Sequence, residues 1–187
     1  ALLVGVNTGC GNTDIANMPR SALDLEGGWL RYERQKNGVM RRIPLWPETV
    51  DALRRAIAQR PDPADPADDD LVFLTARGTR YVRVQASKKT ADRFVTINAL
   101  ARRFDLILAA LNLDGKKGRG FYTLRHVVET IGGDARDQVA LNSIMGHSDG
   151  TQAGAYRERI ADERLQNVVN TIRAWLSGAP QNGGPKS

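Results

Sequence analysis

Residues 29–45 read WLRYERQKNGVMRRIPL, and this stretch predicts a β-hairpin. Apolar and charged residues alternate on both sides of Asn37-Gly38, as they do on strands with one buried face. An Asn-Gly pair tolerates the positive φ angles of a two-residue hairpin turn. We therefore expect two antiparallel strands joined by a tight turn, with Lys36 beside that turn.

Helical periodicity dominates the chain outside this hairpin. Apolar residues recur at helical spacing, with turn signals between the segments, over residues 12–18, from Pro47 onward, from Thr96 to about Asn112, and over 123–132, 135–145 and 161–177. LVFLT at 71–75 predicts a short buried strand after a Pro- and Asp-rich loop at 61–70, and the basic stretch 77–89 predicts a turn or hairpin. The expected fold is α+β and mainly α-helical, with a small antiparallel sheet from residues 29–45 and 71–84.

Composition limits the class of protein. The 187 residues include 27 Lys+Arg against 21 Asp+Glu, a formal net charge of +6 that makes a polyanion a plausible partner. No apolar run approaches the ~20 residues of a membrane span, which excludes a transmembrane protein. The single cysteine, Cys10, allows no internal disulfide and indicates a reducing cytoplasm, where we expect a small buried thiol.

One domain over residues 1–178 is expected, followed by a flexible tail at 179–187 that has nothing to bury. The chain opens ALLVGVNTG, with neither an initiator Met nor a basic stretch before the apolar residues. We therefore expect a fragment of a longer protein and not a signal peptide.

Four separated segments carry chemically active side chains. They are Lys36 at the hairpin turn, Arg125-His126 at a helix start, His147 in a Gly-His pair, and Tyr156 nine residues later. Each alone has an ordinary structural explanation: a solvated lysine, a salt-bridged arginine, a helix-capping histidine or a surface tyrosine. Because the helix dipole opposes a cation near its N-terminus, Arg125 needs either a carboxylate or a bound anion.

The order and spacing of these segments resemble the catalytic domain of the tyrosine recombinases, or phage integrases. That family has a K-x-G hairpin followed by Arg and Ile-Pro-Leu, then L-R-H, then G-H, then a tyrosine nine residues on. Thr8-Gly9 followed by Asp14-Ile15 resembles a further family segment, T-G-x-R-x-x-E. The resemblance extends from residue 1 to about residue 176.

The resemblance implies that Tyr156 attacks a DNA phosphate, giving a 3′-phosphotyrosine and a free 5′-hydroxyl. Arg125 and His147 would bind the non-bridging oxygens, where cationic and imidazole donors stabilise the developing charge. Lys36 would protonate the leaving 5′-oxygen. The implied partner is double-stranded DNA, and neither a metal ion nor another cofactor is required, because the phosphotyrosine conserves the phosphodiester energy.

Two positions depart from the family pattern. Gly11 stands where the family has its first arginine, and Tyr122 stands where it has a histidine two residues before L-R-H. Losing one donor to an oxyanion costs about 10²–10³ in rate, and losing a general base costs about 10² or more. We expect Arg119 to be the first candidate for compensation, with Tyr122 and His126 as accessory residues. Further arginines close to Gly11 or the hairpin are Arg20, Arg31 and Arg34.

Six basic residues outside these segments are candidate DNA phosphate contacts, although each also fits a solvated charged surface. They are Lys88, Lys89, Arg102, Arg103, Lys116 and Lys117. The expected function is site-specific recombination. The alternatives are a catalytically degenerate DNA-binding or regulatory protein and, less well supported by the spacing, a type IB topoisomerase.

Relatives of this kind carry a separate N-terminal helical DNA-binding domain, which is absent from this sequence. We expect a monomer in isolation and an oligomer such as a tetramer on DNA. The helix at 161–177 has a broad apolar stripe that would contact a neighbouring subunit or pack within the chain.

Overall fold

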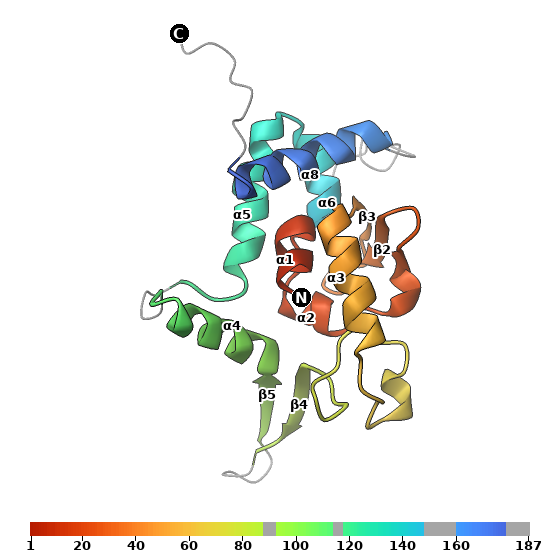
Figure 1. The fold of residues 1–187 in the computed structure, drawn as a ribbon, viewed down its shortest axis with the longest axis vertical. Coiled ribbons are helices and arrows are strands. Elements are labelled where there is room, and N and C mark those ends of the chain that lie inside the picture. The colour runs from red at the N-terminus through yellow and green to blue at the C-terminus, as the bar shows by residue number, and fades with distance from the viewer. Residues whose placement is uncertain (88–92, 114–117, 148–159, 179–187) are drawn as a thin grey trace.

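The computed structural model describes residues 1–87, 93–113, 118–147 and 160–178. It confirms a mainly α-helical α+β fold (Figure 1). The helices are α1 (Leu2–Thr8), α2 (Asn12–Ala16), α3 (Pro47–Ala58), α4 (Ala99–Ala110), α5 (Thr123–Gly132), α6 (Gln138–Met145) and α8 (Asp162–Leu176). The strands are β1 (Leu23–Asp24), β2 (Trp29–Glu33), β3 (Met40–Pro44), β4 (Val82–Ala86) and β5 (Phe94–Asn98).

The predicted hairpin forms β2 and β3 of a three-stranded antiparallel sheet with the order β1-β2-β3. Leu30 pairs with Ile43 across the hairpin, and both side chains are fully buried. The two-residue turn was a wrong expectation. The Arg34 N–H bonds to the Val39 carbonyl at 2.8 Å, which leaves a four-residue loop, and within it only Gly38 has a positive φ, at 70°.

The predicted strand at 71–75 is also wrong. Leu71 forms only an isolated bridge with Pro19, and Leu74 forms another with Arg80. The bonds around the first bridge run from the Arg20 N–H to the Asp70 carbonyl and from the Val72 N–H to the Met18 carbonyl, and no further pair of described residues extends it into a ladder. The expected single sheet from 29–45 and 71–84 is therefore replaced by the β1-β2-β3 sheet and a separate β4-β5 hairpin.

Two predicted helices begin later than their apolar spacing indicates. The helix expected from Thr96 begins at Ala99, because Phe94–Asn98 pairs with β4 and the Asn98 side chain accepts the Ala101 N–H at 2.9 Å. The helix expected over 135–145 begins at Gln138, where the Asp137 side chain caps the Ala140 N–H at 3.0 Å. In both cases an N-cap residue sets the start.

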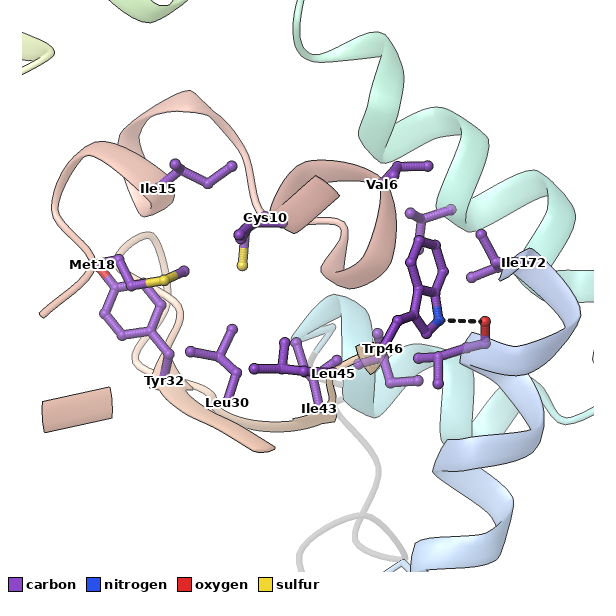
Figure 2. Packing of buried hydrophobic residues seen from close by; sticks show 14 of the residues in the cluster. Val6, Cys10, Ile15, Met18, Leu30, Tyr32, Ile43, Leu45, Trp46 and Ile172 are labelled. Atoms are coloured by element: carbon purple, nitrogen blue, oxygen red, sulfur yellow. Dashed lines mark hydrogen bonds between the residues drawn. The ribbon is translucent and has the colours of Figure 1, made fainter. Parts of the chain in front are cut away.

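The core lies where α1, α3, α5, α6 and α8 pack against one another and against β3 (Figures 1 and 2). Trp46, at the β3–α3 junction, is 3% exposed, and its indole N–H donates to the Val169 carbonyl of α8 at 2.9 Å. Asn7 of α1 is fully buried and bonds both the Pro44 carbonyl and the Trp46 N–H, at 3.0 and 2.8 Å. These bonds fix β3 between the N-terminal and C-terminal helices.

Helix α8 confirms the predicted helix at 161–177 and packs on α5, α6 and β3 of the same chain. Its buried stripe is Leu165, Val168, Val169 and Ile172. Trp175 and Leu176, expected in the same stripe, are 43% and 49% exposed. The middle of the stripe is thus used within the chain, and only its C-terminal end is available to a second protein.

Other expectations have mixed outcomes. Cys10 is buried, and burial is the main cause that raises the pKa of its thiol. No helix in the described ranges has both the length and the apolarity to cross a bilayer. The tail at 179–187 lies outside the described residues.

Candidate functional site

Arg125 lies in the first turn of α5 and is only 4% exposed. Its Nη1 donates to the Gly9 carbonyl and its Nη2 to the Met145 carbonyl, each at 2.8 Å. These two carbonyls lie at the C-terminal ends of α1 and α6, where helix carbonyls lack intrahelical partners and the dipole is negative. The C-terminal ends of α1 and α6 therefore stabilise the Arg125 guanidinium, whose positive charge is disfavoured by the dipole of α5.

Two glycines with positive φ build these helix ends. Gly9 has φ 67° at the end of α1, and Gly146 has φ 63° at the end of α6. A Cβ atom would lie 2.8 Å from the Met145 sulfur at Gly9, and 3.0 Å from Arg41 Cδ at Gly146. Both the backbone conformation and the close packing therefore require glycine, and the turn at Gly146 brings His147 to Arg125.

His147 contacts Arg125 through its ring. Its Nε2 lies 3.2 Å from Arg125 Nη2, and because a guanidinium only donates, Nε2 accepts this bond and the ring proton is on Nδ1. Burial lowers the pKa of His147, the charges of Arg125 and Arg34 lower it further, and Glu129 opposes the shift. The neutral imidazole is therefore the main form at pH 7.

The hairpin loop docks against the end of α6. Arg34 Nη1 and Asn37 Nδ2 both donate to the Gly146 carbonyl, at 3.0 and 3.1 Å. Lys36 lies between these two anchors and is exposed. The loop thereby brings Lys36 to the same part of the surface as Arg125.

A hollow of about 250 Å³, here called the basic hollow, lies where α2, the hairpin loop and α5 meet. It is lined by Gly11, Asn12, Thr13, Asp14, Arg34, Lys36, Tyr122 and Arg125. Asp14, its one carboxylate, forms a salt bridge at 3.0 Å with the fully buried Arg41. Arg34 and Lys36 form no salt bridge with any residue that the structure describes. The hollow is therefore positively charged and suited to an anion.

The two departures from the family pattern face each other in the basic hollow. A Cβ atom on Gly11 would lie 3.6 Å from the Tyr122 ring, an ordinary van der Waals contact. Gly11 has φ −80° and ψ 176°, a conformation that any residue adopts. Tyr122 is half exposed, and its ring packs edge-on against His126 with 5.2 Å between the centroids. The absent arginine and the absent histidine thus belong to the same hollow.

Among the described residues, the other predicted basic side chains do not line the basic hollow. Arg119 is exposed and donates to the Leu113 carbonyl at 3.3 Å. Arg102 and Arg103 are exposed on α4, away from the residues that line the hollow. Five predicted residues lie outside the described residues, namely Lys88, Lys89, Lys116, Lys117 and Tyr156.

Arg34 lines the basic hollow, whereas the sequence identified it only as one of the arginines close to Gly11 or the hairpin. A signal for it exists in the strand period, because Leu30 and Tyr32 are buried while Arg31 and Glu33 are exposed. Arg34 continues the buried face, where a cation needs polar partners, and the Gly146 carbonyl is one of them.

A second cavity, of about 380 Å³, lies between α1, α2 and α4 and has a mainly apolar lining. Among the described residues on its wall, Arg103 has the only charged side chain, so this cavity is poorly suited to a phosphate. Among the residues with described positions, no group of three or more His, Cys, Asp or Glu side chains is arranged to hold a metal ion.

No protein-family model matches the sequence, and no curated protein matches it. Solved structures do match its fold. The XerA recombinase has a TM-score of 0.55 and 18% identity, with 95% of this chain and 56% of that chain covered.

The Tn1549 transposon integrase in complex with circular intermediate DNA has a TM-score of 0.58 and 16% identity, with coverages of 96% and 58%. A variant of that integrase bound to transposon right end DNA has a TM-score of 0.55 and 16% identity, with coverages of 92% and 58%. This chain spans a little over half the length of each matched chain. The chain therefore has the fold of a tyrosine recombinase catalytic domain.

Proposed function

We propose that this chain is the catalytic domain of a site-specific DNA recombinase that cleaves and rejoins strands through a 3′-phosphotyrosine at Tyr156. The observation that carries the proposal is that Arg125 and Lys36 line the basic hollow together and that His147 contacts Arg125. These side chains are far apart in sequence, and they meet in a fold shared with two recombination proteins.

Arg125 would bind the non-bridging oxygens of the scissile phosphate. A guanidinium has five N–H donors, and after the bonds to Gly9, Met145 and His147 at least two remain for an anion. The carbonyl bonds hold the group in place before DNA arrives. A fixed donor stabilises the charge of the transition state without reorganising during the reaction.

His147 would donate to the same phosphate once it gains a proton. In the DNA-free protein its pKa is low because burial and the charges of Arg125 and Arg34 disfavour the imidazolium. A bound phosphate places negative charge beside the ring and favours the imidazolium. DNA binding would therefore change His147 from an acceptor for Arg125 into a donor to the phosphate.

Lys36 would act as the general acid. As the bond between the Tyr156 oxygen and phosphorus forms, the bond between phosphorus and the 5′-oxygen breaks, and Lys36 gives that oxygen its proton. The phenol has an ordinary pKa of ~10, so nearby cations would assist the transfer of its proton to solvent water. Rejoining runs the same steps in reverse, with the 5′-hydroxyl as the nucleophile.

The test is a search for covalent adducts in a library of nicked duplexes of random sequence. Adducts that survive detergent are isolated with the protein and sequenced. We expect enrichment of particular sequences with the wild-type chain and no adduct with Tyr156→Phe. Adducts that persist in Tyr156→Phe would contradict Tyr156 as the nucleophile.

The second candidate function is a DNA-binding or regulatory protein without cleavage activity. It is favoured by Gly11 and Tyr122, because both replace chemically active residues within one hollow. It predicts salt-sensitive duplex binding with no adduct from any member of the library. The same library therefore separates the two functions.

We also propose that several copies, such as four, assemble on DNA. Trp175 and Leu176, the exposed end of α8, are the part of its apolar stripe that a second copy would cover. Substituting both with Ser is expected to prevent higher-order complexes on DNA while leaving single-copy binding intact. Gel-shift stoichiometry measures both species.

A further inference from the structure

We propose that Arg34 supplies the second guanidinium of the basic hollow and contacts the same DNA phosphate as Arg125, in place of the arginine absent at position 11. The inference rests on the proposed function, because it assigns a further residue to that site.

The geometry places the two guanidinium groups on neighbouring carbonyls. Arg125 Nη2 donates to the Met145 carbonyl at 2.8 Å, and Arg34 Nη1 donates to the next carbonyl, that of Gly146, at 3.0 Å. Both side chains line the basic hollow. The bond to Gly146 uses one of the five N–H donors of Arg34, so the group retains donors for an anion.

The charges around Arg34 favour an anion at this point. The pKa of Arg125 is lowered first by burial and next by the charge of Arg34, so the two cations lie close enough to repel each other. Asp14, the one carboxylate of the hollow, is bonded to Arg41, and Arg34 has no salt bridge with a described residue. A phosphate between the two arginines would turn this repulsion into attraction to a shared ligand.

The other arginines near the hollow are less suitable. Arg41 is fully buried against Asp14, so it cannot contact DNA directly. Arg119 is bonded to the Leu113 carbonyl and does not line the hollow. Arg34 is therefore preferred to Arg119 as the compensating residue.

A substitution at Gly11 allows a second, independent test of the role of Arg34. Its extended backbone and the 3.6 Å contact to Tyr122 allow a side chain to be added without strain. An arginine introduced there would enter the hollow from α2, opposite the hairpin loop. Gly11→Arg should therefore replace Arg34 when Arg34 is removed.

The experiment measures duplex binding by fluorescence anisotropy over a range of salt concentrations. Each phosphate neutralised contributes about 0.9 to the slope of log K against log salt. We expect Arg34→Gln to reduce that slope by about one, and Gly11→Arg in the Arg34→Gln background to restore it. An unchanged slope in Arg34→Gln, or a slope that Gly11→Arg does not restore, would overturn the inference.

Two variants control for charge and for folding. Arg31→Gln removes an exposed arginine from the opposite face of β2, and we expect its slope to match the wild type. Asn37→Ala removes the other bond to the Gly146 carbonyl without changing the charge. If Asn37→Ala lowers the slope as much as Arg34→Gln, anchoring of the loop explains the effect and the inference is wrong.

A cleavage assay separates this inference from the proposed function. With a duplex that yields the Tyr156 adduct, Arg34→Gln should slow single-turnover cleavage by about 10²–10³, and Gly11→Arg should recover most of that loss. Adduct formation that needs Tyr156 but not Arg34 would refute the inference and leave the proposed function standing. If no duplex yields an adduct, the proposed function fails, and the salt slope alone decides the role of Arg34.

Discussion

Replacing Arg125 with Ala is expected to destabilise the protein as well as to abolish the proposed strand cleavage. The side chain bonds the buried ends of α1 and α6 through the Gly9 and Met145 carbonyls. A buried carbonyl that loses its donor costs about 1–3 kcal/mol, so the two together cost about 2–6 kcal/mol. The variant also no longer buries a cation, and the desolvation cost that this avoids offsets part of the loss. The free energy of unfolding should therefore decrease by about 2–4 kcal/mol.

Urea unfolding followed by tryptophan fluorescence measures this loss. The free energy of unfolding decreases by about 2 kcal/mol per molar urea, so the urea concentration at the unfolding midpoint should be lower by about 1–2 M in Arg125→Ala. The midpoint of Arg125→Lys should decrease by less, because an ammonium keeps the positive charge although it cannot bond both carbonyls. Arg119→Ala is the matched control, because this exposed arginine makes one peripheral bond and its loss should change stability by less than about 0.5 kcal/mol. Equal midpoints for Arg125→Ala and Arg119→Ala would refute the reasoning.

Three further predictions concern stability. Asn7→Leu leaves the Trp46 N–H and the Pro44 carbonyl unpaired in the core, so the free energy of unfolding should fall by about 2–4 kcal/mol in urea titrations. Asp137→Ala removes the N-cap of α6, which costs about 1 kcal/mol, and also the two bonds that Arg164 donates to this carboxylate, so Tm in calorimetry should fall by more than the loss of the cap alone predicts. The pKa of His147 in the folded protein lies below its ordinary value of 6.5, so as pH falls below 6.5 the unfolded chain takes up the proton first. The free energy of unfolding should therefore decrease as pH falls below 6.5. His147→Asn should lose less stability than the wild type over the same pH range.

Each of these has an outcome that would contradict it. Asn7→Leu as stable as wild type would mean that water or neighbouring groups satisfy the two backbone atoms. Asp134→Ala, at an exposed carboxylate near α6, should leave Tm unchanged, and an equal loss in both variants would argue against capping. Identical acid slopes for wild type and His147→Asn would show that other groups cause the pH dependence.

The sequence predicted the elements in which the spacing of apolar residues matches the buried positions. The stripe at 161–177 became α8 (Asp162–Leu176), and alternation around Leu30 and Tyr32 became β2. The stretch 71–75 has an equally apolar pattern, but in the structure it forms only isolated bridges, at Leu71 and Leu74. A pattern of burial does not specify the partner that a strand needs to form a ladder.

The sequence did not predict the contacts that hold Arg125 in place. Sequence reasoning required a carboxylate or an anion for Arg125, whereas the structure supplies the backbone carbonyls of Gly9 and Met145. Every residue carries a carbonyl, so no residue type marks the two that a fold brings to a guanidinium. Arg34 could have been found from the strand period, since it continues the buried face of β2.

The anchoring of Arg125 also bears on how the protein is made. The carbonyls it holds belong to residues 9 and 145, which are separated by most of the described chain. A ribosome must therefore synthesise the chain through Met145 before this guanidinium can contact both partners, and contacts of such long range form late and slowly. A product that ends before α6 lacks the Met145 carbonyl, so the Arg125 guanidinium is held at only one of its two helix ends until α6 has been made.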